Sequence, residues 1–101
     1  MQFLIHVLDK RGGTAQRAEL YDRHTAHLAD PGRYGVTIIS TGRLVADDGS
    51  TPIGNLLLVE APDRASVEAF NGADPFTTGG VWEMATISRF VHLRGASLNP
   101  A

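Results

Sequence analysis

The sequence predicts an α+β fold in which strands and helices follow the order β-α-β-β-α-β. Four short runs rich in β-branched and apolar residues are typical of strands. They occupy residues 3–8, 36–45, 53–60 and 81–91. Two segments with helical periodicity, 14–29 and 63–71, separate the first run from the second and the third from the fourth. A turn-forming segment at 47–50 joins the second and third runs, so these two strands form a hairpin.

The first strand is apolar on both of its faces. Phe3 and Val7 represent one face, and Leu4 and Leu8 represent the other. His6 is the one polar residue between them. Because a buried imidazole needs a hydrogen-bond partner, His6 is either a strand-edge donor or a residue that contacts a substrate.

The helix boundaries follow from capping and helix-breaking residues. Thr14 is a candidate N-cap for a helix that runs to about Ala29, where Asp30-Pro31-Gly32 stops it. Asp63 is a candidate N-cap for the second helix. Asn71-Gly72 supplies a left-handed C-terminal signal, so we expect the second helix to end there.

This order of elements is the ferredoxin-like arrangement, a four-stranded antiparallel sheet with both helices on one face. The helices leave the other face uncovered. Alternate strand positions point to that face, and they are either the set that includes Leu4, Leu8, Leu56 and Leu58 or the residues next to these in sequence. Too many residues in these two sets are apolar for both sets to contact water. We therefore expect a homodimer in which the bare faces of two sheets pack together.

Composition excludes several classes of protein. With 101 residues, we expect one domain at 1–93 and a flexible C-terminal tail at 94–101. The net charge of −2 and the scattered Lys and Arg residues give no nucleic-acid footprint. The chain has no cysteine, and no apolar run approaches the roughly 18–20 residues that span a membrane. The N-terminus reads as a strand rather than a signal peptide, so a cytoplasmic protein is expected.

Two short segments carry the chemistry. His24-Thr25-Ala26-His27-Leu28 lies late in the first helix, and Ala73-Asp74-Pro75-Phe76 follows the second. Histidine titrates near neutral pH, and a nearby carboxylate orients its ring. Proline holds Asp74 in an extended backbone, which also suits an ordinary turn. We predict that His27 and Asp74 lie within hydrogen-bonding distance and form an acid/base dyad.

Other residues are candidates for the same site. His24 is either a second site residue or an exposed side chain on the flank of the helix. Arg43 follows Gly42 at a strand end and is a candidate for binding an anionic substrate oxygen. Phe76 and Trp82 are candidate aromatic walls, with core packing as their alternative. His24 and His27 are three residues apart and no cysteine can join them, so no metal and no other cofactor is expected.

The chain resembles the YCII (YciI-like) family over residues 2–91. The resemblance rests on His27-Leu28 in the first helix and on Asp74-Pro75-Phe76 before the last strand. Where members commonly carry an arginine three residues before the histidine, this chain has His24. The resemblance implies a dimeric α+β barrel with a His–Asp pair as its active site. It also implies acid/base chemistry on small aromatic-derived compounds, including elimination of HCl from chlorinated hydroxyhydroquinones.

We therefore expect a cofactor-free lyase in which His27 removes a proton from a ring hydroxyl, chloride departs and a hydroxybenzoquinone forms. General base catalysis contributes about 10²–10⁴-fold, which suits an already activated substrate. Two alternatives stay open. One is a non-catalytic module that binds or senses a small molecule in the same pocket, and the other is an isomerase resembling muconolactone isomerase.

Overall fold

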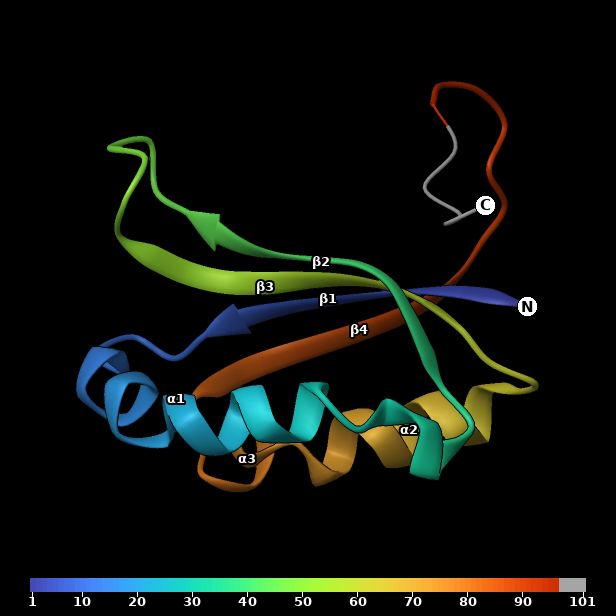
Figure 1. Ribbon diagram of the computed structural model, residues 1–101. Helices are drawn as coiled ribbons and strands as arrows, with labels where there is room; N and C mark the ends of the chain where they lie inside the picture. The colour runs from blue at the N-terminus through green and yellow to red at the C-terminus, as the bar shows by residue number, and fades with distance from the viewer. Residues whose placement is uncertain (97–101) are drawn as a thin grey trace.

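The computed structural model describes residues 1–96 and has the predicted α+β architecture (Figure 1). One antiparallel sheet has the strand order β2-β3-β1-β4. Its strands are β1 (Gln2–Asp9), β2 (Thr37–Val45), β3 (Pro52–Glu60) and β4 (Trp82–Phe90). All helices lie on one face of this sheet (Figure 1). They are α1 (Thr14–Leu28), the short 3-10 helix η1 (Pro31–Tyr34), α2 (Arg64–Ala73) and α3 (Pro75–Thr78).

The core lies between the sheet and the helices. Along β1 every second side chain points toward the helices, and Phe3, Ile5 and Val7 are buried. Val67 and Phe70 of α2 pack against them from the helical layer. Burial of these apolar side chains is the main driving force that holds the helices on the sheet.

One predicted helix end is confirmed and two differ from the predictions. Asp63 is the N-cap of α2 and accepts a hydrogen bond from the Ser66 backbone at 2.8 Å, as predicted. Thr14 is the first residue of α1 rather than its N-cap, and no side chain caps that end. The prediction that α2 ends at Asn71-Gly72 is wrong, because the helix continues through Gly72 to Ala73. It stops at Asp74, since Pro75 favours an extended backbone in the residue before it.

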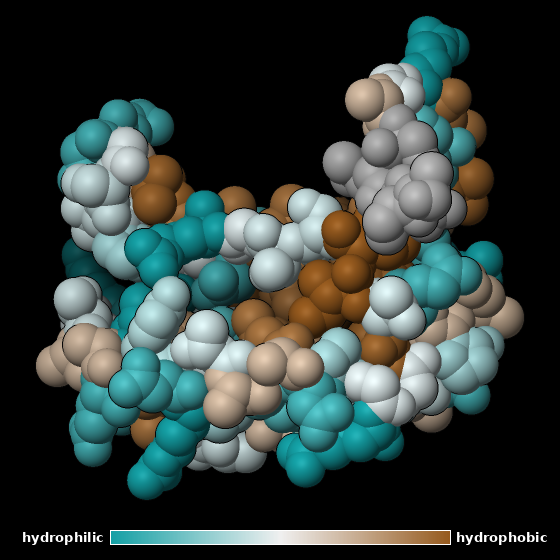
Figure 2. All heavy atoms as spheres, viewed as in Figure 1, coloured by the Kyte–Doolittle hydropathy of each residue, from teal (hydrophilic) through white to brown (hydrophobic). Residues whose placement is uncertain are grey.

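The second face of the sheet carries no helix among residues 1–96. The strand register pairs Leu4 with Leu58 and His6 with Leu56, which places all four side chains on this face. The β2–β3 turn and residues 91–96 project on the same side (Figure 1), and the surface is hollowed between the two projections (Figure 2). A hollow of about 510 Å³ on this face is lined mainly by leucines and Phe90. We call this surface the open sheet face.

Of the predicted C-terminal tail, residues 94–96 are exposed and form neither helix nor strand, while 97–101 lie outside the described residues. Within residues 1–96, no helix combines the length and the hydropathy that a membrane span requires.

Candidate active site

The two histidines of α1 are both buried, but they have different partners. Nδ1 of His24 donates a hydrogen bond to the Asp74 carboxylate, with its oxygens at 2.8 and 2.9 Å. Nε2 of His27 instead donates to the backbone carbonyl of Phe70 at 2.8 Å. The prediction that His27 pairs with Asp74 is therefore wrong. Residues three apart on an α-helix differ by about 60° in direction, so His24 reaches the start of α3 while His27 reaches the end of α2.

The Asp74 carboxylate both binds His24 and caps helix α3. It is 2% exposed and stands between α2 and α3, where its side chain also accepts a hydrogen bond from the Phe76 backbone N–H at 2.9 Å. That bond caps α3, which Pro75 begins. Because the helix cap fixes the carboxylate, the carboxylate in turn fixes the orientation of the His24 ring.

Aromatic side chains hold the other surfaces of His24. Phe76 stacks on the imidazole with a centroid distance of 3.9 Å and an interplanar angle of 4°. Trp82 meets the same ring edge-on at 5.9 Å. Phe76 and Trp82 are buried and do not line the pocket into which His24 faces. Their predicted place as walls of a substrate pocket is therefore corrected: they pack behind the imidazole, as expected for large apolar rings.

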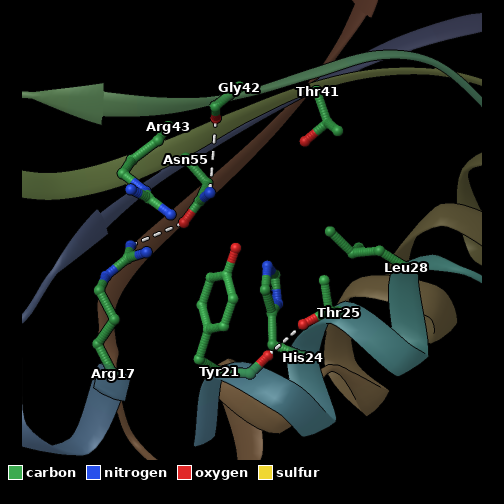
Figure 3. A pocket seen from close by; sticks show the side chains of 9 residues that line it. All are labelled: Arg17, Tyr21, His24, Thr25, Leu28, Thr41, Gly42, Arg43 and Asn55. Atoms are coloured by element: carbon green, nitrogen blue, oxygen red, sulfur yellow. Dashed lines mark hydrogen bonds between the residues drawn. The ribbon is translucent and has the colours of Figure 1, made fainter.

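The free ring nitrogen of His24 faces a pocket between α1 and the β2–β3 edge of the sheet (Figure 3). Among residues 1–96, Trp82 Nε1 is the one fully buried side-chain polar atom without a partner. Nε2 of His24 also has no hydrogen-bond partner in these residues, but it is not fully buried and is therefore accessible. The pocket measures about 190 Å³. Its lining consists of Arg17, Tyr21, His24, Thr25, Leu28, Thr41, Gly42, Arg43 and Asn55.

Two arginines border this pocket in different ways. Arg17 is buried, forms two hydrogen bonds of 2.8 and 2.7 Å to the Asp9 carboxylate, and donates to Asn55 Oδ1 at 2.7 Å. Its charge is thus already paired. Arg43 is exposed, lies 5.8 Å from the centre of the Tyr21 ring, and forms no ion pair within the described residues. Arg43 is therefore available to a ligand, and its binding of an anionic substrate oxygen stays a prediction.

The predicted site residues do not include Arg17, Tyr21 or Asn55, which line the pocket. Three of the α1 residues that line the pocket follow a helical spacing, with Arg17, Tyr21 and His24 at i, i+4 and i+7. Such spacing places side chains on one face of a helix and was a usable signal. Asn55 gave a weaker one, since it is a polar residue within an apolar strand and therefore needs a partner.

His6 lies away from the pocket. It is opposite Leu56 of β3 and Thr86 of β4, which puts it on the open sheet face, whereas His24 lies among the helices. Alternation along β1 explains this position, since neighbours of the buried Ile5 and Val7 point the other way. The prediction that His6 joins the site of His24 is corrected accordingly. Near His24 and Asp74, residues 1–96 bring no third His, Cys, Asp or Glu into a possible metal cluster.

A family model for the YCII-related domain matches residues 1–91. The chain belongs to the YCII family. Among solved structures, this YCII chain is similar to 5-chloro-2-hydroxyhydroquinone dehydrochlorinase (TftG) from Burkholderia phenoliruptrix AC1100, in complex with 2,5-dihydroxybenzoquinone. The two are 29% identical with a TM-score of 0.79, over 91% of this chain and 95% of that one. Among curated proteins, none has a sequence that matches this chain.

Proposed function

We propose that this YCII protein is a cofactor-free acid/base lyase that eliminates HCl from a chlorinated hydroxyhydroquinone, with His24 as its base and acid. The observation that carries the proposal is the His24–Asp74 pair, whose free Nε2 opens on a pocket of about 190 Å³. The similarity to a dehydrochlorinase supports the reaction class. His24 takes the role that the sequence prediction gave to His27.

The elimination requires a base that gives its proton back. His24 Nε2 removes a proton from a ring hydroxyl and returns it to the chlorine-bearing carbon, which becomes tetrahedral and leaves a carbonyl behind. Removal of a second hydroxyl proton then moves electrons through the ring, and chloride leaves with its bonding pair. The products are a hydroxybenzoquinone, chloride and one proton. Proton transfers of this kind contribute about 10²–10⁴-fold to a rate.

Asp74 positions His24 and stabilises the imidazolium that forms. Because the carboxylate accepts the Nδ1–H, the neutral ring has its lone pair on Nε2, which is the atom that faces the pocket. Deprotonated ring oxygens carry negative charge, and Arg43 is the pocket cation without a carboxylate partner in the described residues. We assign it to hold that charge through its fork of donors.

The open sheet face supports a homodimer as the working form. Leu4, Leu56, Leu58 and Phe90 line a hollow of about 510 Å³ there, and the two projecting segments frame it. A second copy of the same face would remove this apolar surface from water. Sedimentation at micromolar concentration should give a dimer, because an interface of ordinary size persists at that concentration. A monomer near 11 kDa would contradict it.

The function is tested by incubating the protein with 5-chloro-2-hydroxyhydroquinone and measuring chloride release and quinone absorbance together. Catalysed release of one chloride per quinone is the expected result. Saturable binding without chloride release would contradict the lyase and favour the binding or sensing module that the sequence left open. Conversion to an isomer that retains chlorine would favour the isomerase.

A further inference from the structure

A second pocket lies on the opposite flank of α1 from the candidate active site. It measures about 370 Å³ and shares no residue with the pocket of His24. Helix α1, the segment that follows it and the α2–α3 junction form its walls. The lining residues are Arg23, Ala26, His27, Asp30, Arg33, Ala73 and Pro75. We call it the His27 pocket.

His27 contributes a fixed hydrogen-bond acceptor to this pocket. Its Nε2 bonds to the Phe70 carbonyl at 2.8 Å, and because a carbonyl only accepts, that nitrogen carries the proton. The ring stacks on Phe70 at 4.8 Å and meets Tyr34 edge-on at 5.5 Å, which holds its orientation. His27 is 7% exposed, and Nδ1 has no partner within residues 1–96. Since Nδ1 is not fully buried, its lone pair is open to a ligand.

The same pocket carries an excess of positive charge. Arg23 forms no ion pair within the described residues. Arg33 lies 3.9 Å from the Asp30 carboxylate, and both side chains are mostly exposed, so this pair is loose. The pocket therefore holds two guanidinium groups and one carboxylate beside the His27 imidazole. That imidazole accepts a hydrogen bond when it is neutral.

We propose that the His27 pocket binds a small oxyanion that carries its own hydroxyl group, such as hydrogen phosphate or an α-hydroxycarboxylate. The anionic oxygens bind Arg23 and Arg33, which match such groups in geometry and charge. The hydroxyl group donates its proton to His27 Nδ1. An anion without a hydroxyl binds the arginines but leaves the Nδ1 lone pair without a donor, so it binds more weakly.

The position of this pocket gives binding a structural consequence. Ala73 and Pro75 flank Asp74, so a ligand in the His27 pocket bridges α1 to the junction that holds the Asp74 carboxylate. A ligand that binds only the folded chain raises its melting temperature by mass action. Because no residue is shared with the pocket of His24, this inference stands or falls separately from the proposed lyase activity.

Two matched pairs of probes test the proposal by calorimetric titration at pH 8, where an imidazole is ordinarily neutral. Inorganic phosphate is compared with sulfate, and lactate with propionate, at constant ionic strength. Sulfate and propionate cover the Nδ1 acceptor without donating a hydrogen bond to it, and the loss of that hydrogen bond predicts about tenfold weaker binding than that of phosphate and lactate. The tighter of phosphate and lactate identifies the chemical source of the ligand. Equal binding within both pairs, or no saturable binding of any probe, would overturn the proposal.

Variants and histidine spectra complete the test. Arg23→Gln should weaken phosphate binding about tenfold, since it removes a charge-assisted hydrogen bond. The control is Arg94→Gln, which replaces an exposed arginine outside the pocket and should leave phosphate binding unchanged. Phosphate should shift the ring nitrogen signals of His27 and leave those of His24 in place. Undiminished binding by Arg23→Gln, or signals of His27 that do not move, would contradict the assignment. Chloride release by Arg23→Gln at the wild-type rate shows that the two pockets are distinct.

Discussion

His24 and His27 lie one turn apart on α1, are both nearly buried, and each has one ring nitrogen bonded to the protein. They differ in what that nitrogen contacts. His24 bonds to a carboxylate, which stabilises an imidazolium, whereas His27 bonds to a neutral carbonyl. They also differ in the free nitrogen, because His24 faces the pocket of Arg43 and His27 faces the pocket of Arg23. The partner and the pocket, rather than residue type or burial, decide which histidine is suited to acid/base work.

The largest expected effect comes from exchanging each histidine in turn. His24→Gln should lower chloride release by about 10²–10⁴-fold, since it removes the group that transfers protons. His27→Gln should mainly lower the melting temperature, because it disturbs the stacking on Phe70, with a far smaller loss of rate. Rates are compared after circular dichroism confirms that both variants are folded. A larger loss of rate in His27→Gln than in His24→Gln would reverse the comparison.

Asp74→Asn tests the hydrogen-bond partner of His24 rather than the imidazole itself. The amide retains an acceptor for His24 but loses the negative charge. A hydrogen bond to a charged group contributes about 1.5–3 kcal/mol, so the rate of chloride release should fall about ten- to hundredfold. Asn71→Ala, at a buried residue of α2 outside both pockets, serves as a control for disturbance of α2. An Asp74→Asn variant with the full rate of chloride release would show that the carboxylate has no role in the proposed reaction.

Glycine substitutions test how α3 holds Asp74 against α1. A Cβ at Gly79 would lie 2.1 Å from Leu20 Cδ1 and 2.7 Å from the Pro75 carbonyl oxygen, so α3 must move. Gly79→Ala should therefore lower the free energy of unfolding by about 1–3 kcal/mol, as overpacking usually does.

Gly72→Ala is the matched control, because a Cβ there meets nothing within 4 Å and the residue lies inside α2. It should stabilise the chain by about 0.5–1 kcal/mol. Urea unfolding measures both variants. A Gly79→Ala protein as stable as Gly72→Ala would show that the close contact of α3 with α1 is not needed.

The smallest effect concerns an exposed carboxylate that contrasts with the buried Asp74. In the β2–β3 turn, Asp48 accepts hydrogen bonds from the Thr51 hydroxyl and from the backbone N–H groups of Thr51 and Ser50, which lower its pKa from 3.8 to about 2. A carboxyl group with a lowered pKa stabilises the fold above its unfolded pKa, and the contribution is lost as pH falls through the folded value.

Asp48→Asn should therefore be slightly less stable than wild type at neutral pH. The difference should shrink as pH falls from about 3.8 toward about 2. Thermal melts across this range measure it, with Asp47→Asn in the same turn as the control. A stability difference that does not change with pH would show that the hydrogen bonds to the charged form have no part in it.

The fold could be predicted further than the site. Strand alternation and the Asp63 cap are local signals, and the structure keeps both. The choice between His24 and His27 depends on the rotation of α1 about its axis, which packing against α2 and α3 sets. Helix α3 has four residues and therefore no periodicity to detect. Without it, nothing in the sequence places Asp74 beside His24, or Phe76 behind the ring.

The most direct test of the account is a long-range ¹⁵N spectrum of the histidine side chains, recorded with and without 2,5-dihydroxybenzoquinone. In the free protein, His24 should carry its proton on Nδ1 and His27 on Nε2, as their partners require. Addition of the quinone should shift the Nε2 signal of His24 and leave both nitrogens of His27 unchanged. A shift confined to His27, or a His24 ring protonated on Nε2 alone, would contradict the assignment of His24 and Asp74 as the reactive pair.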